Sequence, residues 1–225
     1  MDSITTRRLS PDREAEKASW SAIREICCRT GDNGRPIARE RWDFFSKIWI
    51  DPYEMLVPQW TYVAVVQETT VGYLTGCPDS KKLSRSKAWR VTLPLLMQIV
   101  LARYRTTPGA REFARRALGL GKRPERSFPR LAHQSMANFY PAHLHVNVEE
   151  RYRRMGIGGR LIENYLADLR EQGVSGVHLY CAADPVEFYL RSGFKVMEVE
   201  QFQNGPIFAL GRTAQANEGA QTTRQ

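Results

Sequence analysis

The chain has 225 residues, of which 42% are hydrophobic and 25% charged, and its formal net charge at pH 7 is +9. This length exceeds that of a typical domain and falls short of two, so we predict one α/β domain with an added segment. No apolar run approaches the ~18 residues that span a bilayer, and the N-terminal residues lack the apolar stretch of a secretory signal. These features exclude a helical integral membrane protein and predict a cytoplasmic one.

Cysteine usage points to a reducing compartment. Cys27, Cys28, Cys77 and Cys181 show no C-x-x-C spacing, and only four histidines accompany them. That pattern matches no zinc site. We therefore expect free, structural thiols and no metal.

The first third of the chain alternates between strand and helix patterns. The predicted elements are a strand at 4–9, helices at 11–30 and 39–50, and an antiparallel hairpin of strands at 60–67 and 70–75. Gly31 is expected to end the first helix, and Pro52 the second.

A basic, helical segment follows the predicted hairpin. Between Lys81 and Arg130 the chain holds fourteen Lys and Arg residues and two Glu residues, a net charge of +12, so the remaining residues sum to −3. Helices are predicted at 89–104 and 110–118, with a loop at 119–129. A local field of one sign favours an acidic or polyanionic partner, although a solvated basic face is the commoner explanation. No zinc finger or other nucleic-acid motif is present, so no specific nucleic-acid partner is predicted.

The second half contains a βαβ pattern. Its predicted elements are a strand at 142–148, a helix at 158–172, a strand at 177–182, a short helix at 185–191, and strands at 195–202 and 206–210. Asn204-Gly205 is typical of a hairpin turn between the last two strands. The polar tail at 213–225 is expected to be disordered.

A glycine-rich motif lies where the first of these strands meets its helix. Residues 153–160 read Arg-Arg-Met-Gly-Ile-Gly-Gly-Arg, with the spacing R-x-x-G-x-G. Free backbone N–H groups and the helix dipole favour a bound phosphate at such a helix start, and glycines let the ligand approach the backbone. Tight packing is the alternative explanation for a lone G-x-G at this place.

A second motif, F-Y-x-x-x-G-F, occupies residues 188–194. With these two motifs in this order, the sequence resembles the GNAT superfamily of acetyl-CoA-dependent acetyltransferases. More loosely, residues 26–32, 52–53 and 140–145 resemble a subgroup that includes the acetyltransferase-like domains associated with O-GlcNAcases. The resemblance implies a mixed, mostly antiparallel sheet with a splayed parallel strand pair and helices on both faces. It also implies one domain at 1–212, with a helical basic insertion at about 80–140 and an acetyl-CoA-binding core at about 142–202.

The resemblance also implies how acetyl-CoA lies. The pantetheine arm would occupy the gap between the splayed strands, and the pyrophosphate would accept N–H bonds from the glycine loop, with arginines adding charge-assisted contacts. Solvent exposure is the alternative for Arg153 and Arg154. The residues that the resemblance places at the cofactor are Val146, Val148, Arg153, Arg154, Met155, Gly156, Ile157, Gly158, Gly159 and Arg160.

Tyr189 corresponds to the family tyrosine that donates to the departing CoA thiolate. A phenol with a pKa of about 10 stays protonated at pH 7 and has a proton to give. The alternative is an aromatic that only packs beside Phe188 and Phe194.

Two histidines, His143 and His145, alternate on the predicted strand 142–148. A primary amine is cationic at pH 7, so a base must remove its proton, and either imidazole as base predicts a fall in kcat/KM below a pKa of about 6–7. Arylalkylamine acetyltransferases have a similar pair one residue further from the glycine loop, a slip that turns both rings to the other face. The alternative is that both histidines are structural and that Glu149, Asp51 or a water chain acts as the base.

Together these features predict an N-acetyltransferase that transfers acetyl from acetyl-CoA to a primary amine by direct attack in a ternary complex. No cysteine lies within the motifs as an acyl carrier, which favours direct transfer. The alternatives are a catalytically weak acyl-CoA-binding module and an adaptor that uses the basic segment. The amine acceptor is unidentified, and the oligomeric state is open, a homodimer included.

Overall fold

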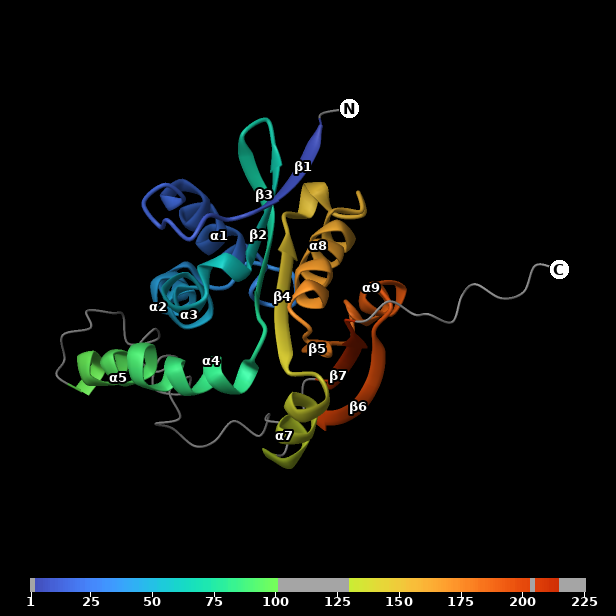
Figure 1. Ribbon diagram of the computed structural model, residues 1–225. Helices are drawn as coiled ribbons and strands as arrows, with labels where there is room; N and C mark the ends of the chain where they lie inside the picture. The colour runs from blue at the N-terminus through green and yellow to red at the C-terminus, as the bar shows by residue number, and fades with distance from the viewer. Residues whose placement is uncertain (1–2, 101–129, 203–204, 215–225) are drawn as a thin grey trace.

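A seven-stranded sheet forms the centre of the fold in the computed structural model, which describes residues 3–100, 130–202 and 205–214 (Figure 1). The strand order is β1-β2-β3-β4-β5-β7-β6, and the neighbours are antiparallel except for β4 and β5. The strands are β1 (Ile4–Arg8), β2 (Thr61–Val66), β3 (Thr69–Cys77), β4 (Ala142–Val148), β5 (Gly176–Ala182), β6 (Lys195–Phe202) and β7 (Gly205–Thr213). This confirms the expected mixed, mostly antiparallel sheet with one parallel pair.

Helices cover both faces of this sheet (Figure 1). Helix α8 packs against β1 to β4 on one face, and α1 and α3 pack against β3 on the other. The α-helices are α1 (Lys17–Thr30), α2 (Trp42–Trp49), α3 (Asp51–Leu56), α4 (Ser80–Lys87), α5 (Leu93–Val100), α7 (Arg130–Phe139), α8 (Ile157–Glu171) and α9 (Val186–Arg191). Shorter turns are the 3-10 segments η1 (Arg39–Arg41), η2 (Pro58–Trp60) and η4 (Glu150–Tyr152) and the π-helical η3 (Ala88–Thr92).

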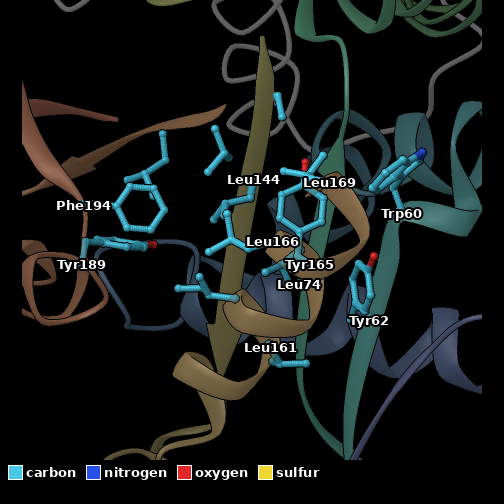
Figure 2. Packing of buried hydrophobic residues seen from close by; sticks show 14 of the residues in the cluster. Trp60, Tyr62, Leu74, Leu144, Leu161, Tyr165, Leu166, Leu169, Tyr189 and Phe194 are labelled. Carbon is cyan, nitrogen blue, oxygen red and sulfur yellow. The ribbon is translucent and has the colours of Figure 1, made fainter. Parts of the chain in front are cut away.

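The core under α8 matches the apolar face that its sequence predicts. Leu161, Ile162, Tyr165, Leu166 and Leu169 are all buried, and Figure 2 shows several of them packed between α8 and the sheet. The hydroxyl of Tyr165 donates to the backbone carbonyls of Cys77 on β3 (2.9 Å) and His143 on β4 (3.0 Å). This bond pair fixes α8 against the strand that carries both histidines.

A second core fills the opposite face. Trp20, Ile23 and Ile26 of α1 are buried there against Tyr53 of α3 and Tyr73 of β3. The helix begins later than its sequence suggests, because residues 12–16 form a turn in which Asp12 Oδ1 accepts from the backbone N–H groups at positions 14 and 15. Helix α1 therefore runs from Lys17, not from residue 11.

The second predicted helix ends where expected, since α2 stops at Trp49, but a new helix follows at once. Pro52 lies in the first turn of this helix, α3, where its missing N–H costs no hydrogen bond. One other predicted boundary is wrong. The helix expected at 89–104 begins at Ser80, because Asp79 caps α4 by accepting from Lys82 N at 2.8 Å. Helix α7 is not among the predicted elements. The predicted helix at 110–118, the loop at 119–129 and most of the tail lie outside the described residues.

The β2–β3 hairpin confirms its prediction. Gln67 and Glu68 take φ values of +46° and +65°, the left-handed pair of a two-residue turn. Among the residues that the structure describes, no helix is both long and apolar enough to cross a bilayer.

Candidate active site

The parallel strands β4 and β5 separate after two residue pairs. Their register covers Ala142 with Val177 and His143 with His178, while β4 continues to Val148 and β5 to Ala182. Beyond His143, the edge of β4 that faces β5 pairs with no strand among the described residues. Its backbone groups are therefore free to pair with an extended ligand, which is the way a pantetheine arm could be held.

The glycine loop ends at the N-terminus of α8. Gly156 has φ +75°, a left-handed conformation that favours glycine, and no side chain of the described residues caps the helix. The first N–H groups of α8 thus lack intrahelical partners. A Cβ at Gly156 or Gly159 would meet nothing within 4 Å, so this helix end is open to a phosphate group.

Gly158 serves a different purpose in the structure. A Cβ at this position would lie 2.8 Å from Cζ of Phe188, so the missing side chain lets α9 pack against α8. The close-packing explanation for this glycine is therefore supported by geometry. Because Phe188 precedes Tyr189, the same contact positions Tyr189.

The arginines of the loop have different surroundings. Arg153 donates from Nε to Val148 O (3.1 Å) and from Nη2 to Gly34 O (2.9 Å), which ties the loop to the turn after α1. Arg160 donates to Ile4 O at 3.3 Å. Arg154 is exposed, has φ +64°, and its side chain forms no hydrogen bond or ion pair with the described residues. Of the three, it has the guanidinium freest to reach a phosphate.

Tyr189 lies on α9 between two aromatic rings. Its ring centroid is 5.0 Å from that of Phe188 and 5.7 Å from that of Phe194. Burial raises the pKa of Tyr189, with the nearby Cys181 adding to the effect, so the phenol is protonated at neutral pH. In Figure 2 its hydroxyl points from α9 toward β4, and no described residue bonds to it.

His143 and His145 lie on the face of β4 that is turned toward α1, α2 and α3. The intervening Leu144 belongs to the core under α8, where Val146 and Val148 also pack. His143 Nδ1 is 3.2 Å from the Tyr53 hydroxyl, and the two imidazole rings are perpendicular with centroids 4.8 Å apart. Because side chains alternate between the two faces of β4, both histidines lie on the face toward α1, α2 and α3, and both valines lie on the face toward α8.

Both imidazoles are neutral at pH 7. Burial lowers the pKa of His145 to about 4, with a smaller contribution from Lys87. Burial also lowers the pKa of His143 well below its usual value, helped by the neighbouring His145, His178 and Lys87. If His145 is the base, kcat/KM is therefore not expected to fall at a pKa of 6–7, because the neutral form of His145 persists to about pH 4.

The two carboxylates that are alternative bases, Asp51 and Glu149, are paired with arginines. Asp51 Oδ1 is 2.8 Å from Arg24 Nη2. Glu149 lies 3.7 Å from Arg29 Nη1 and 3.4 Å from Arg151 Nε. Each of these carboxylates therefore already has a cationic partner in the structure.

A pocket of about 180 Å³ lies between α1, α2 and the strands β3 and β4, and His145 is part of its wall. His143 is behind this wall. The lining residues are Cys27, Thr30, Gly31, Phe45, Trp49, Ile50, Tyr73, Thr75, His145 and Asn147. Sequence reasoning missed all of these except His145, although the alternation of β4 does place Asn147 on the same face.

Comparison with known proteins identifies the family. Residues 135–209 match the model of the acetyltransferase (GNAT) domain. The crystal structure of SsHAT is 30% identical in sequence, with a TM-score of 0.72, over 95% of this chain and 100% of that one. Ard1 from Thermoplasma volcanium (17% identity, TM-score 0.51, 93% and 97% covered) shares the fold. So does YncA from Salmonella typhimurium, solved with acetyl-CoA (11% identity, TM-score 0.51, 96% and 96% covered).

The chain therefore belongs to the GNAT family of acetyltransferases. It is an acyltransferase.

Proposed function

We propose that this protein transfers the acetyl group of acetyl-CoA to a primary amine by direct attack in a ternary complex. The observation that carries the proposal is the split between β4 and β5. On one side of β4 the hydroxyl of Tyr189 has no described partner, and on the other His145 lines a pocket. A thioester in the split would lie between a proton donor and a candidate base.

Each residue then has a defined proton to move. The amine nitrogen forms a bond to the thioester carbonyl carbon, and His145 accepts the proton that the nitrogen loses. The carbon–sulfur bond breaks with its electron pair on sulfur, and Tyr189 donates the proton that makes the CoA thiol. The His143 ring packs edge-on against that of His145 and would position it, and the Tyr53 hydroxyl lies 3.2 Å from His143 Nδ1.

The thiols support direct attack over a cysteine-bound acetyl group. Burial raises the pKa of Cys27 to about 11 and that of Cys28, Cys77 and Cys181 to about 12. Thiols are nucleophilic as thiolates, so at pH 7 these four are poor acyl acceptors.

The proposal is tested by the release of free CoA from acetyl-CoA with a panel of primary amines. We expect turnover with at least one amine, loss of kcat in Tyr189→Phe, and no loss in the control Tyr140→Phe, whose hydroxyl donates to the Met197 sulfur at 3.7 Å. Tight acetyl-CoA binding without turnover on any amine would contradict the proposal and would favour a weak acyl-CoA-binding module.

A further inference from the structure

We infer that the acceptor is a small primary amine that carries one apolar or aromatic group and no second positive charge, and that this group occupies the pocket beside His145. The inference rests on the proposed function and names its substrate class. The pocket measures about 180 Å³. An apolar cavity of about 150 Å³ takes up benzene, so this one has room for a single ring with a short linker.

The walls of the pocket are largely apolar and aromatic. Its apolar and aromatic lining residues include Phe45, Trp49, Ile50 and Tyr73. The Trp49 ring meets the His145 ring edge-on at 5.1 Å between centroids and is 6.0 Å from that of Phe45. A ring bound against Trp49 and Phe45 would therefore direct its amine toward His145.

Charge in and around the pocket disfavours a polycation. None of the lining residues is an acid, and the nearby acids Asp51 and Glu149 are paired with arginines. The amine of Lys87 lies 5.6 Å from the Trp49 ring centroid, which places a cation beside the pocket wall. A second ammonium group on the acceptor would be desolvated there without a counter-ion.

One buried hydroxyl of the wall lacks a partner among the described residues. Thr75 is fully buried, and its Oγ1 makes no hydrogen bond, whereas Thr30 Oγ1 donates to Ile26 O (2.8 Å) and Asn147 donates to the Tyr73 hydroxyl (2.9 Å). Thr75 is the register partner of His145 across β3 and β4. The Thr75 hydroxyl is thus an unsatisfied polar group in the pocket wall next to His145, and an amine nitrogen would supply the missing bond where a small movement of the wall exposes it.

The experiment compares three amines on the full chain: 2-phenylethylamine, spermidine, and a lysine amide acetylated on its α-nitrogen. CoA release gives kcat/KM, and calorimetry gives the affinity for 2-phenylethylamine. The test variant is Trp49→Ala, a residue that is 40% exposed and not needed to fill the core. Trp89→Ala is the matched control, because Trp89 is 74% exposed and lies on η3, outside the pocket.

We expect kcat/KM for 2-phenylethylamine to exceed that for the other two amines at least tenfold, and its affinity to fall about tenfold in Trp49→Ala but not in Trp89→Ala. Equal or faster turnover of spermidine or the lysine amide, or unchanged affinity in Trp49→Ala, overturns the inference. Binding that depends on Trp49 without CoA release on any amine supports the pocket assignment and contradicts only the transfer. Absence of both binding and release overturns both.

Discussion

Replacement of Thr75 by valine should make the protein more stable and less active. Valine has the shape of threonine without the hydroxyl, and the Thr75 hydroxyl is fully buried with no hydrogen bond to the described residues. An unsatisfied buried hydroxyl costs about 1–3 kcal/mol, so the variant should gain about 1 kcal/mol or more in free energy of unfolding. For a chain of this size that gain corresponds to a rise of about 2–4 °C in Tm per kcal/mol.

The activity should change in the opposite direction. If the hydroxyl binds the acceptor nitrogen, its loss should lower kcat/KM about tenfold, with unchanged affinity for acetyl-CoA. Thr61→Val is the matched control, since Thr61 pairs with Thr75 across β2 and β3, is equally buried and unpartnered, and does not line the pocket. Thermal unfolding and CoA release measure both effects. A Thr75→Val protein with full activity would refute the role of this hydroxyl.

Three further predictions concern the two sides of the split. Tyr189→Phe should lower kcat about 10²-fold or more and leave acetyl-CoA affinity within twofold, as measured by steady-state kinetics and calorimetry; an unchanged kcat would make Tyr189 a packing residue. If His145 is the base, kcat/KM should fall only toward pH 4 and lose this limb in His145→Gln, because the pKa of His145 is lowered to about 4; a limb that persists in the variant places the base elsewhere. Gly158→Ala should lower Tm by crowding Phe188, whereas Gly159→Ala, with free space for its Cβ, should raise the free energy of unfolding by up to about 1 kcal/mol; equal Tm values for the two variants would contradict this packing.

The lowered pKa of His145 also predicts how stability depends on pH. The folded chain holds His145 neutral down to about pH 4, whereas an unfolded histidine takes up a proton near pH 6.5. Between these two values the unfolded state binds more protons, so the free energy of unfolding should fall as the pH is lowered through this window. Urea unfolding of the parent and of His145→Gln across this window measures the effect, and an equally steep fall in both proteins would contradict it.

The second half of the fold was readable from sequence because its signals are local. The strand 142–148, the helix that follows it and the strand beyond it each have a strict period of two or 3.6 residues, and β4, α8 and β5 match them within one residue. The ends of helices were harder to predict from the sequence. Pro52 fits equally the end of one helix and the first turn of the next, and only the packing of Tyr53 into the core selects the second.

The pocket could not be found from the sequence because it joins distant segments. Trp49 ends α2, Thr75 lies on β3 and His145 on β4, and nothing in their spacing shows that they share one cavity. The face on which the histidines lie was also undecided, since strand alternation gives only the relative orientation of His143 and His145. Their absolute orientation follows from Leu144, which is part of the core under α8.

A base with a pKa of about 4 is weak in water. The same buried environment that lowers the pKa of His145 also lowers the pKa of the acceptor amine. Removal from water penalises every charged form, so a pocket without acids lowers the pKa of a bound ammonium as well as that of the imidazole. An amine that enters this pocket would give up its proton before or during binding. His145 would then need to take a proton only as the carbon–nitrogen bond forms, when the nitrogen becomes strongly acidic. The absence of acids among the lining residues is thus consistent with both the low histidine pKa and a singly charged, apolar acceptor.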